Sequence, residues 1–201
     1  VAGDLVQSLM TGNSRRIRWV GYRSVAASSH PRPWDVMPVR ICAHAFAQNQ
    51  PRHDLYLSPD HAVFVDGALV PVRYLLNGAT ISQVNVEAIK YYHVELESEA
   101  GTVVHDVISA EGLPVESYLD TGNRSAFANG GVPVAVHPDF ARKVWSEASC
   151  APLMVSGSLV EGVRKALLAN AIAQGHVMTV DADSHLIVDD AAVVDFLDAP
   201  A

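Results

Sequence analysis

The sequence predicts a mainly β fold of short antiparallel strands, followed by a small α+β extension towards the C-terminus. Three observations predict this fold class. Up to about residue 118, the apolar runs are short and clusters of turn-forming residues separate them. Two of these turns contain Asp-Gly and Asn-Gly, which suit two-residue hairpins. Helical periodicity follows only after the Gly-, Asn- and Ser-rich segment DTGNRSAFANGG.

The β part consists of candidate strands that are separated by recognisable turns. The cluster TGNS separates the first two strands, and a polar QNQPRHD loop separates the third from the fourth. Asp66-Gly67 and Asn77-Gly78 each join a pair of strands as a hairpin. In chain order, the expected strands are Leu5–Leu9, Ile17–Tyr22, Val39–Ile41, Leu55–Leu57, Ala62–Val65, Ala68–Val70, Tyr74–Leu76, Ile81–Gln83, Ala88–Glu97, VHDVIS and LPVESY. Such a series favours an antiparallel barrel or sandwich-like fold over βαβ units.

The extension is predicted to contain two helices and a final strand, turn and strand. A short helix is expected from His137 to Glu147 and a longer one from Ser158 to Gln174. For the longer helix, the sequence predicts a capping box of Ser158 and Glu161, a common apolar face and a stop at a glycine; the face and the stop are Leu159, Val163, Leu167 and Gly175. The segment HVMTVDADSHLIV is expected to form a strand, an Asp-rich turn and a second strand.

Composition narrows the classes of partner. The chain has 201 residues, 49% of them hydrophobic, and a net charge of −8. This acidic balance argues against nucleic acid or an anionic membrane as the main partner, because both attract basic surfaces. No apolar run reaches the length of a membrane span, and the opening VAGDLVQSLM is not expected to be a signal peptide.

Four stretches of the β part carry a family resemblance: GDLV, RIRWVGY, LSPDHAVFVDGALVPVRYLLNG and the pair YYHVEL and HDVISAEG. Together they resemble a Hint domain, the fold of hedgehog autoprocessing domains and inteins. The PVRI strand and the VESYLDTGNR tail are similar to those of stand-alone bacterial Hint domains. The resemblance implies a Hint-like horseshoe of strands over residues 1–124, without its first strand, and an α+β extension over residues 125–201.

The resemblance also implies a reaction and its residues. In this family a cysteine thiolate attacks the peptide bond before it, a histidine protonates the leaving amine, and a hydroxyl holds the carbonyl. The hydroxyl and histidine would be Ser58 and His61, with His93 and His105 as orienting partners and Asp106 beside them. The substrate would be the protein's own N-terminal flanking polypeptide, and no cofactor is needed. By itself, Ser58-Pro59-Asp60-His61 is also typical of an ordinary type I turn, and the surrounding family blocks favour the site.

Two departures from the family pattern limit the expected chemistry. Glu116, Ser117 and Tyr118 stand where an intein ends in His-Asn and a nucleophile, so N-terminal cleavage is expected without splicing. The family's cysteine would precede Val1, and neither Cys42 nor Cys150 matches it. The chain as written is therefore expected to be inactive, and the alternative is a degenerate Hint scaffold that acts as a binding module.

Other interpretations of the motifs stay open at this point. His61, His93, His105 and Asp106 carry the donor types that zinc prefers, although their spacing matches no compact ligand motif. The segment DADSHLIVDD resembles a calcium loop but lacks the glycine and the terminal glutamate of an EF-hand, which favours a hairpin turn. The proline-rich HPRPWDVMP is typical of a rigid connector.

Overall fold

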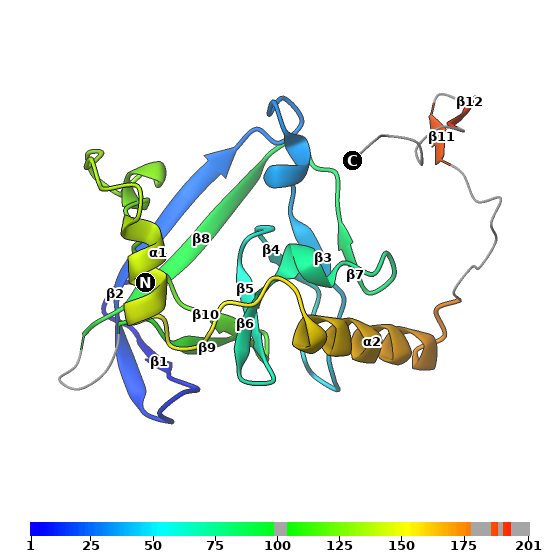
Figure 1. Cartoon of the computed structure of the whole chain (residues 1–201), viewed down its shortest axis with the longest axis horizontal. Coiled ribbons are helices and arrows are strands. Elements are labelled where there is room, and N and C mark those ends of the chain that lie inside the picture. Colours follow the sequence, from blue (N-terminus) through cyan, green and yellow to red (C-terminus); the bar gives the residue numbers. More distant parts are fainter. Residues whose placement is uncertain (99–103, 178–185, 189–190, 194–201) are drawn as a thin grey trace.

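A computed structural model describes residues 1–98, 104–177, 186–188 and 191–193 of the chain. The predicted mainly β architecture with a small helical extension is confirmed (Figure 1). The first sheet has the order β1-β2-β8, the second β4-β3-β7 and the third β6-β5-β10-β9, and all of their pairs are antiparallel. The strands of these sheets are β1 Leu5–Gln7, β2 Ser14–Val25, β3 Val39–Ile41, β4 Leu55–Leu57, β5 Ala62–Val65, β6 Ala68–Pro71, β7 Ile81–Gln83, β8 Ile89–Leu96, β9 Val107–Ala110 and β10 Leu113–Glu116.

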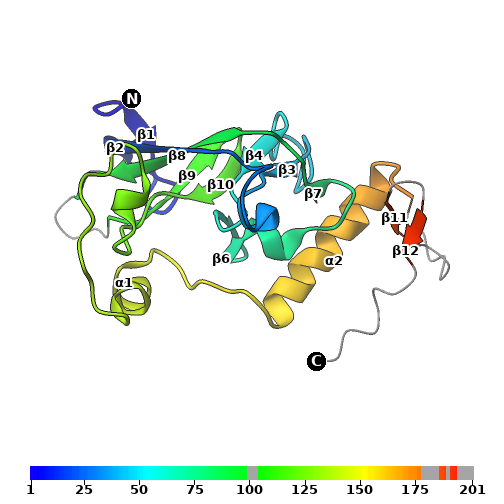
Figure 2. The same cartoon turned by 90° about the horizontal axis from the view of Figure 1, so that it is seen from above.

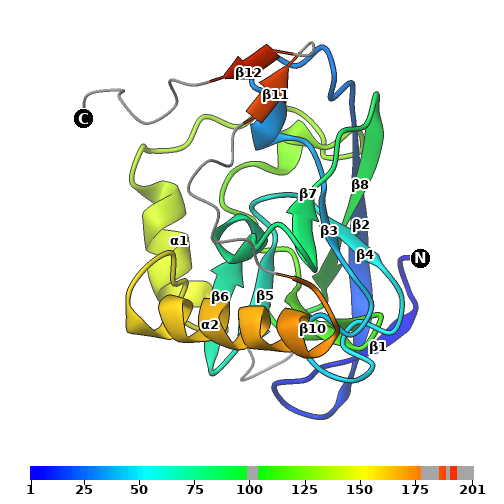
Figure 3. The same ribbon diagram turned by 90° about the vertical axis from the view of Figure 1, so that its right-hand side faces the viewer.

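Short helices lie between strands or just after β10, and two longer ones follow them. The 3₁₀ helices are η1 Pro33–Asp35, η2 Val72–Leu75 and η3 Arg124–Ala126, and the α-helices are α1 Phe140–Ala148 and α2 Ser158–Ala173. Figure 2 shows α1 and α2 on the same side of the long β2–β8 ribbon, and Figure 3 shows the N-terminus on the side away from both. In the part of the chain that the structure describes, no helix has the length and hydropathy to cross a bilayer.

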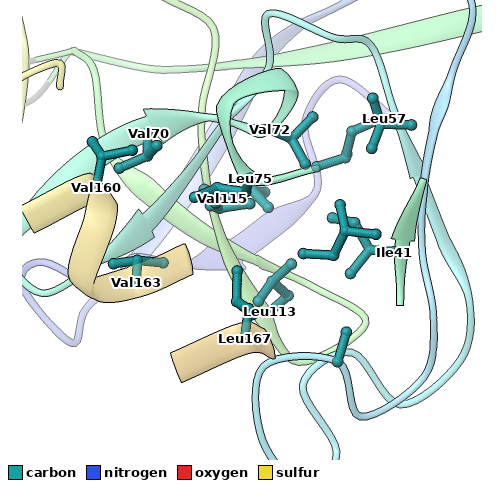
Figure 4. Close-up of a cluster of buried hydrophobic side chains, with 14 residues drawn as sticks. Ile41, Leu57, Val70, Val72, Leu75, Leu113, Val115, Val160, Val163 and Leu167 are labelled. Carbon is teal, nitrogen blue, oxygen red and sulfur yellow. The ribbon is translucent and has the colours of Figure 1, made fainter. Parts of the chain in front are cut away.

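The main core lies where α2 covers the strands of two sheets. Val160, Val163 and Leu167 of α2 are buried against side chains such as Val70 and Leu113 (Figure 4). The predicted apolar face of this helix is therefore confirmed, with Leu159 at its partly buried edge. Burying one such aliphatic side chain stabilises a fold by roughly 1.5–3 kcal/mol, so residues after 124 contribute directly to the stability of the β part.

Polar contacts also fasten α2 to the β part. The side-chain amide of Asn170 donates hydrogen bonds to the carbonyl oxygens of His44 (2.9 Å) and Ala45 (2.7 Å). We expect Asn170→Ala to lower the free energy of unfolding by about 1 kcal/mol, because two carbonyls lose a donor while alanine favours the helix slightly. Urea denaturation measures this, with the exposed Lys165→Ala as control. A variant as stable as the parent would show that these bonds contribute nothing.

Two local predictions are wrong, each for a backbone reason. Tyr74–Leu76 is not a strand: the 3₁₀ helix η2 covers Val72–Leu75, and the amides of Val72 and Arg73 bond to the turn before β5 instead of to a neighbouring strand. Asn77-Gly78 therefore follows η2 and does not join two strands as a hairpin. Ser158 does not cap α2. Gly157 is the N-cap, with φ +93°, and its carbonyl accepts the Glu161 amide.

The end of α2 and the final strands agree with the sequence in part. Gly175 ends the helix as predicted, with φ +92°; its amide bonds to the Ile172 carbonyl while the His176 amide reaches the Ala171 carbonyl. The predicted strand and Asp-rich turn of residues 178–185 lie outside the described residues. The last predicted strand is present as β11 Leu186–Val188, which pairs with β12 Ala191–Val193.

Candidate functional site

A rigid turn between β4 and β5 presents the first two candidate residues. The amide of His61 donates to the Ser58 carbonyl at 3.0 Å, which closes the predicted turn. Backbone bonds to η2 brace it on the other side, since Val72 donates to the His61 carbonyl and Arg73 to the Pro59 carbonyl, each at 3.0 Å. The turn interpretation is thus confirmed, and it is compatible with a site because a braced turn holds its side chains in place.

His93 comes from β8, in the β1-β2-β8 sheet, and its ring lies close to that of His61 in the β4–β5 turn. The centroids of the two imidazole rings lie 5.2 Å apart, and the ring of Phe127 lies 5.1 Å from that of His93. In the strand register His93 pairs with Gly21 of β2. Trp19 covers this glycine so closely that a Cβ there would lie 2.1 Å from its ring, so only glycine allows this packing.

His105 lies just before β9 and is fully buried. Its Nδ1 accepts a hydrogen bond from the Cys150 amide at 3.3 Å, which assigns the ring proton to Nε2. That Nε2 faces Oε2 of Glu116 at 3.5 Å but forms no hydrogen bond with the described residues. The edge of the Trp145 ring, from α1, packs on the imidazole at 5.5 Å. His105 is therefore oriented by the extension.

Asp106 points away from the other candidates. Its carboxylate accepts hydrogen bonds from the Ser8 hydroxyl (2.9 Å) and the Val107 amide (2.7 Å), and it forms an ion pair with Arg15 (2.7 Å). Arg15 and Asp106 are both buried. These contacts tie the first hairpin of the chain to the β9–β10 hairpin.

Two cavities open on the imidazole pair. One, of about 330 Å³, is bounded by Tyr118, Phe127 and Trp145, and the other, of about 290 Å³, runs between β4 and β8. Both are lined by the same five residues: Ser58, His61, Tyr91, His93 and Glu116. The structure thus brings Ser58, His61 and His93 together, places His105 behind Glu116, and leaves Asp106 outside.

Burial determines the protonation of the imidazoles. Loss of solvent lowers the pKa of His61, with the neighbouring His105 acting in the same direction and Glu116 against it. Burial, together with His61, lowers the pKa of His93 to about 4. Nε2 of His61 is buried without a hydrogen-bond partner in the described part of the chain. At neutral pH the imidazoles of His61 and His93 are therefore uncharged, and that of His61 has a ring nitrogen without a hydrogen-bond partner among the described residues.

This burial predicts a pH dependence of stability. The unfolded chain protonates His93 below the ordinary value of 6.5, whereas the folded chain does so only near 4. The contribution of His93 to stability is therefore constant above pH 6.5 and falls between pH 6.5 and 4, with up to about 3 kcal/mol lost. We expect His93→Gln to flatten that part of the curve, as measured by urea denaturation across pH. The exposed His137→Gln is the control, and an unchanged slope in His93→Gln would contradict the expectation.

The cysteines and the zinc interpretation can be placed as well. Burial raises the pKa of the Cys150 thiol to about 12, with Asp106 acting in the same direction, so this thiol is a poor nucleophile. Cys42 is half-buried at the end of β3. In the described ranges, no three His, Cys, Asp or Glu side chains are grouped to hold a metal ion. The zinc interpretation of His61, His93, His105 and Asp106 is not supported.

Sequence reasoning missed Glu116 as a member of the site. Glu116 is the last residue of β10, and Oε1 of its carboxylate accepts a hydrogen bond from the Ala62 amide at 2.7 Å. In LPVE, Leu113 and Val115 are buried and alternate with the less buried Pro114 and Glu116, as the sequence of the strand predicts. That pattern places Glu116 on a strand face, but it gives no indication of what the face meets.

The model of one protein family, described as the Hint domain, matches residues 1–122. No curated protein and no solved structure matches the chain.

Proposed function

The chain belongs to the Hint domain family, and from this premise we propose that it cleaves its own polypeptide at a peptide bond preceding a cysteine, by way of a thioester and without splicing. The observation that carries the proposal is the convergence of Ser58, His61 and His93 on shared cavities. These side chains come from the β4–β5 turn and from β8, about thirty residues apart in sequence. A hydroxyl and an imidazole with an unengaged nitrogen at one cavity fit acyl transfer.

The proton path follows from the uncharged state of His61. Its free Nε2 accepts the proton of the attacking thiol while the sulfur bonds to the carbonyl carbon. When the carbon–nitrogen bond breaks, the same imidazole gives that proton to the leaving amine, so the protons balance and the product is a thioester with a free amine. The Ser58 hydroxyl would donate a hydrogen bond to the carbonyl oxygen as charge develops on it.

The residues after β10 support cleavage without splicing. Tyr118 stands where a splicing domain would need a nucleophile, yet its hydroxyl donates to Asn123 Oδ1 at 2.7 Å and lies 3.3 Å from Asp120 Oδ1. Burial and Asp120 raise the pKa of this phenol. Glu116 and Ser117, in the neighbouring positions, offer no asparagine amide to close a succinimide ring. The thioester would therefore be resolved by an external nucleophile.

The test places a reporter domain and a Cys-initiated segment of the family pattern ahead of Val1. The proposal expects the reporter to be released at the cysteine, faster with added thiol, and as a hydroxamate when hydroxylamine is supplied. Replacement of that cysteine by alanine is the control. Folded protein that stays uncut with and without thiol would overturn the proposal and leave the binding scaffold as the function.

A further inference from the structure

The side chain of Glu116 belongs to the site, and its two carboxylate oxygens face different parts of it. Its side chain is only 12% exposed and lines both cavities. Oε1 accepts the amide of Ala62, the residue that directly follows His61, at 2.7 Å. Oε2 faces Nε2 of His105 at 3.5 Å. One carboxylate therefore links the turn that carries His61 to the buried imidazole behind it.

Three of the carboxylates around this site form ion pairs with arginines. Asp60 and Asp35, on the wall of the larger cavity, pair with Arg73 at 2.8 Å and 3.5 Å. Asp106, behind His105, pairs with Arg15. Arg23 also lines that cavity, and the Cys150 amide donates to Nδ1 of His105, the ring nitrogen that does not face Glu116. Within the described residues, no Arg or Lys forms an ion pair with Glu116, whose carboxylate contacts the Ala62 amide and faces the His105 imidazole.

We infer that Glu116 is a positioning residue of this site, which holds the His61 turn and His105 in place and stabilises the protonated form of His61. A carboxylate in a partly buried site attracts an imidazolium more strongly than one in water does. The charge of Glu116 raises the pKa of His61 and of His93, against the effect of burial, and a hydrogen bond to the Glu116 backbone raises the pKa of His61 as well. Without this charge, an added proton on His61 would be buried beside the second imidazole, that of His93.

The importance of this charge for cleavage rests on the proposed function. In that reaction His61 is a charged imidazolium only between the uptake of the thiol proton and its transfer to the amine. The charge coupling itself does not depend on any reaction. It is therefore testable on the chain as it exists, by NMR titration of the histidine Cε1 protons, with the His61 signal assigned from its loss in His61→Gln.

The decisive variant is Glu116→Gln, which is isosteric and keeps an oxygen for the Ala62 amide. The titration midpoint of His61 is expected to fall by about one pH unit when the charge is removed. Glu111→Gln removes the same charge from an exposed position on the same hairpin and should leave His61 unmoved. Glu116→Asp keeps the charge, so its His61 midpoint should lie nearer to the parent value, and it provides a second test where Glu116→Gln does not fold.

An unchanged His61 midpoint in Glu116→Gln, or equal shifts in Glu116→Gln and Glu111→Gln, would overturn the inference. The cleavage assay gives an independent readout. Coupling that is present in a protein that never cuts itself would retain the inference and reject the proposed function. Cleavage that is active and equally fast in Glu116→Gln, with an unmoved midpoint, would do the reverse.

Discussion

His61→Ala, in the chain that carries the reporter and the Cys-initiated segment ahead of Val1, is expected to slow self-cleavage by about 10²–10⁴-fold. This is the usual contribution of a general acid–base group. The imidazole can both take the thiol proton and return it to the amine, whereas the Asp60 carboxylate of the same turn is paired with Arg73. Its buried Nε2 has no hydrogen-bond partner in the described part of the chain, so the nitrogen is free for that exchange. Release of the reporter, followed by electrophoresis over time, measures the effect.

The control for this variant is His53→Ala, which removes an exposed imidazole that is paired with Glu111 and lies just before β4. Its cleavage rate should equal that of the parent chain. Because removal of a buried ring also leaves a void, the thermal transition of His61→Ala must show that the protein is still folded at the assay temperature. Cleavage within tenfold of the parent rate in folded His61→Ala would mean that another group handles the proton.

The fold was largely accessible from the sequence because its signals are local. Hairpin turns at Asp66-Gly67, short alternating strands and the periodic face of α2 each depend on neighbours within a few positions. The two errors have different causes. At Tyr74–Leu76 distant backbone decided the outcome, because the preceding amides bond to the β4–β5 turn. At Ser158 the cause is local, because the neighbouring Gly157, with φ +93°, takes the N-cap position.

Only part of the site could be predicted from the sequence, because only part of it is formed by neighbouring residues. Ser58 and His61 belong to one short motif, which gives them a fixed relation before the chain folds. Glu116 and Trp145 reach the site from β10 and α1, and no local pattern states that these elements meet. Periodicity identifies the face of a strand, whereas the partner of that face is determined by packing across the whole molecule.

Asp106 marks the limit of such reasoning, because it adjoins His105 in sequence but turns the other way. We expect Asp106→Asn to lower the free energy of unfolding by about 3–5 kcal/mol, since it breaks a buried ion pair and weakens the bonds from Ser8 and Val107. Urea denaturation at pH 7 measures this loss. Glu97→Gln, which disrupts an exposed contact with Arg16 at 3.9 Å, should cost less than about 1 kcal/mol.

The same variant separates a structural role of Asp106 from a catalytic one. A residue that only joins the first hairpin to β9 and β10 affects how many molecules are folded, but not what a folded molecule does. The cleavage rate of Asp106→Asn, measured well below its melting temperature and normalised to folded protein, should therefore match the parent rate. A rate reduced by about a hundredfold in fully folded Asp106→Asn would instead place this carboxylate in the reaction, acting through its neighbour His105.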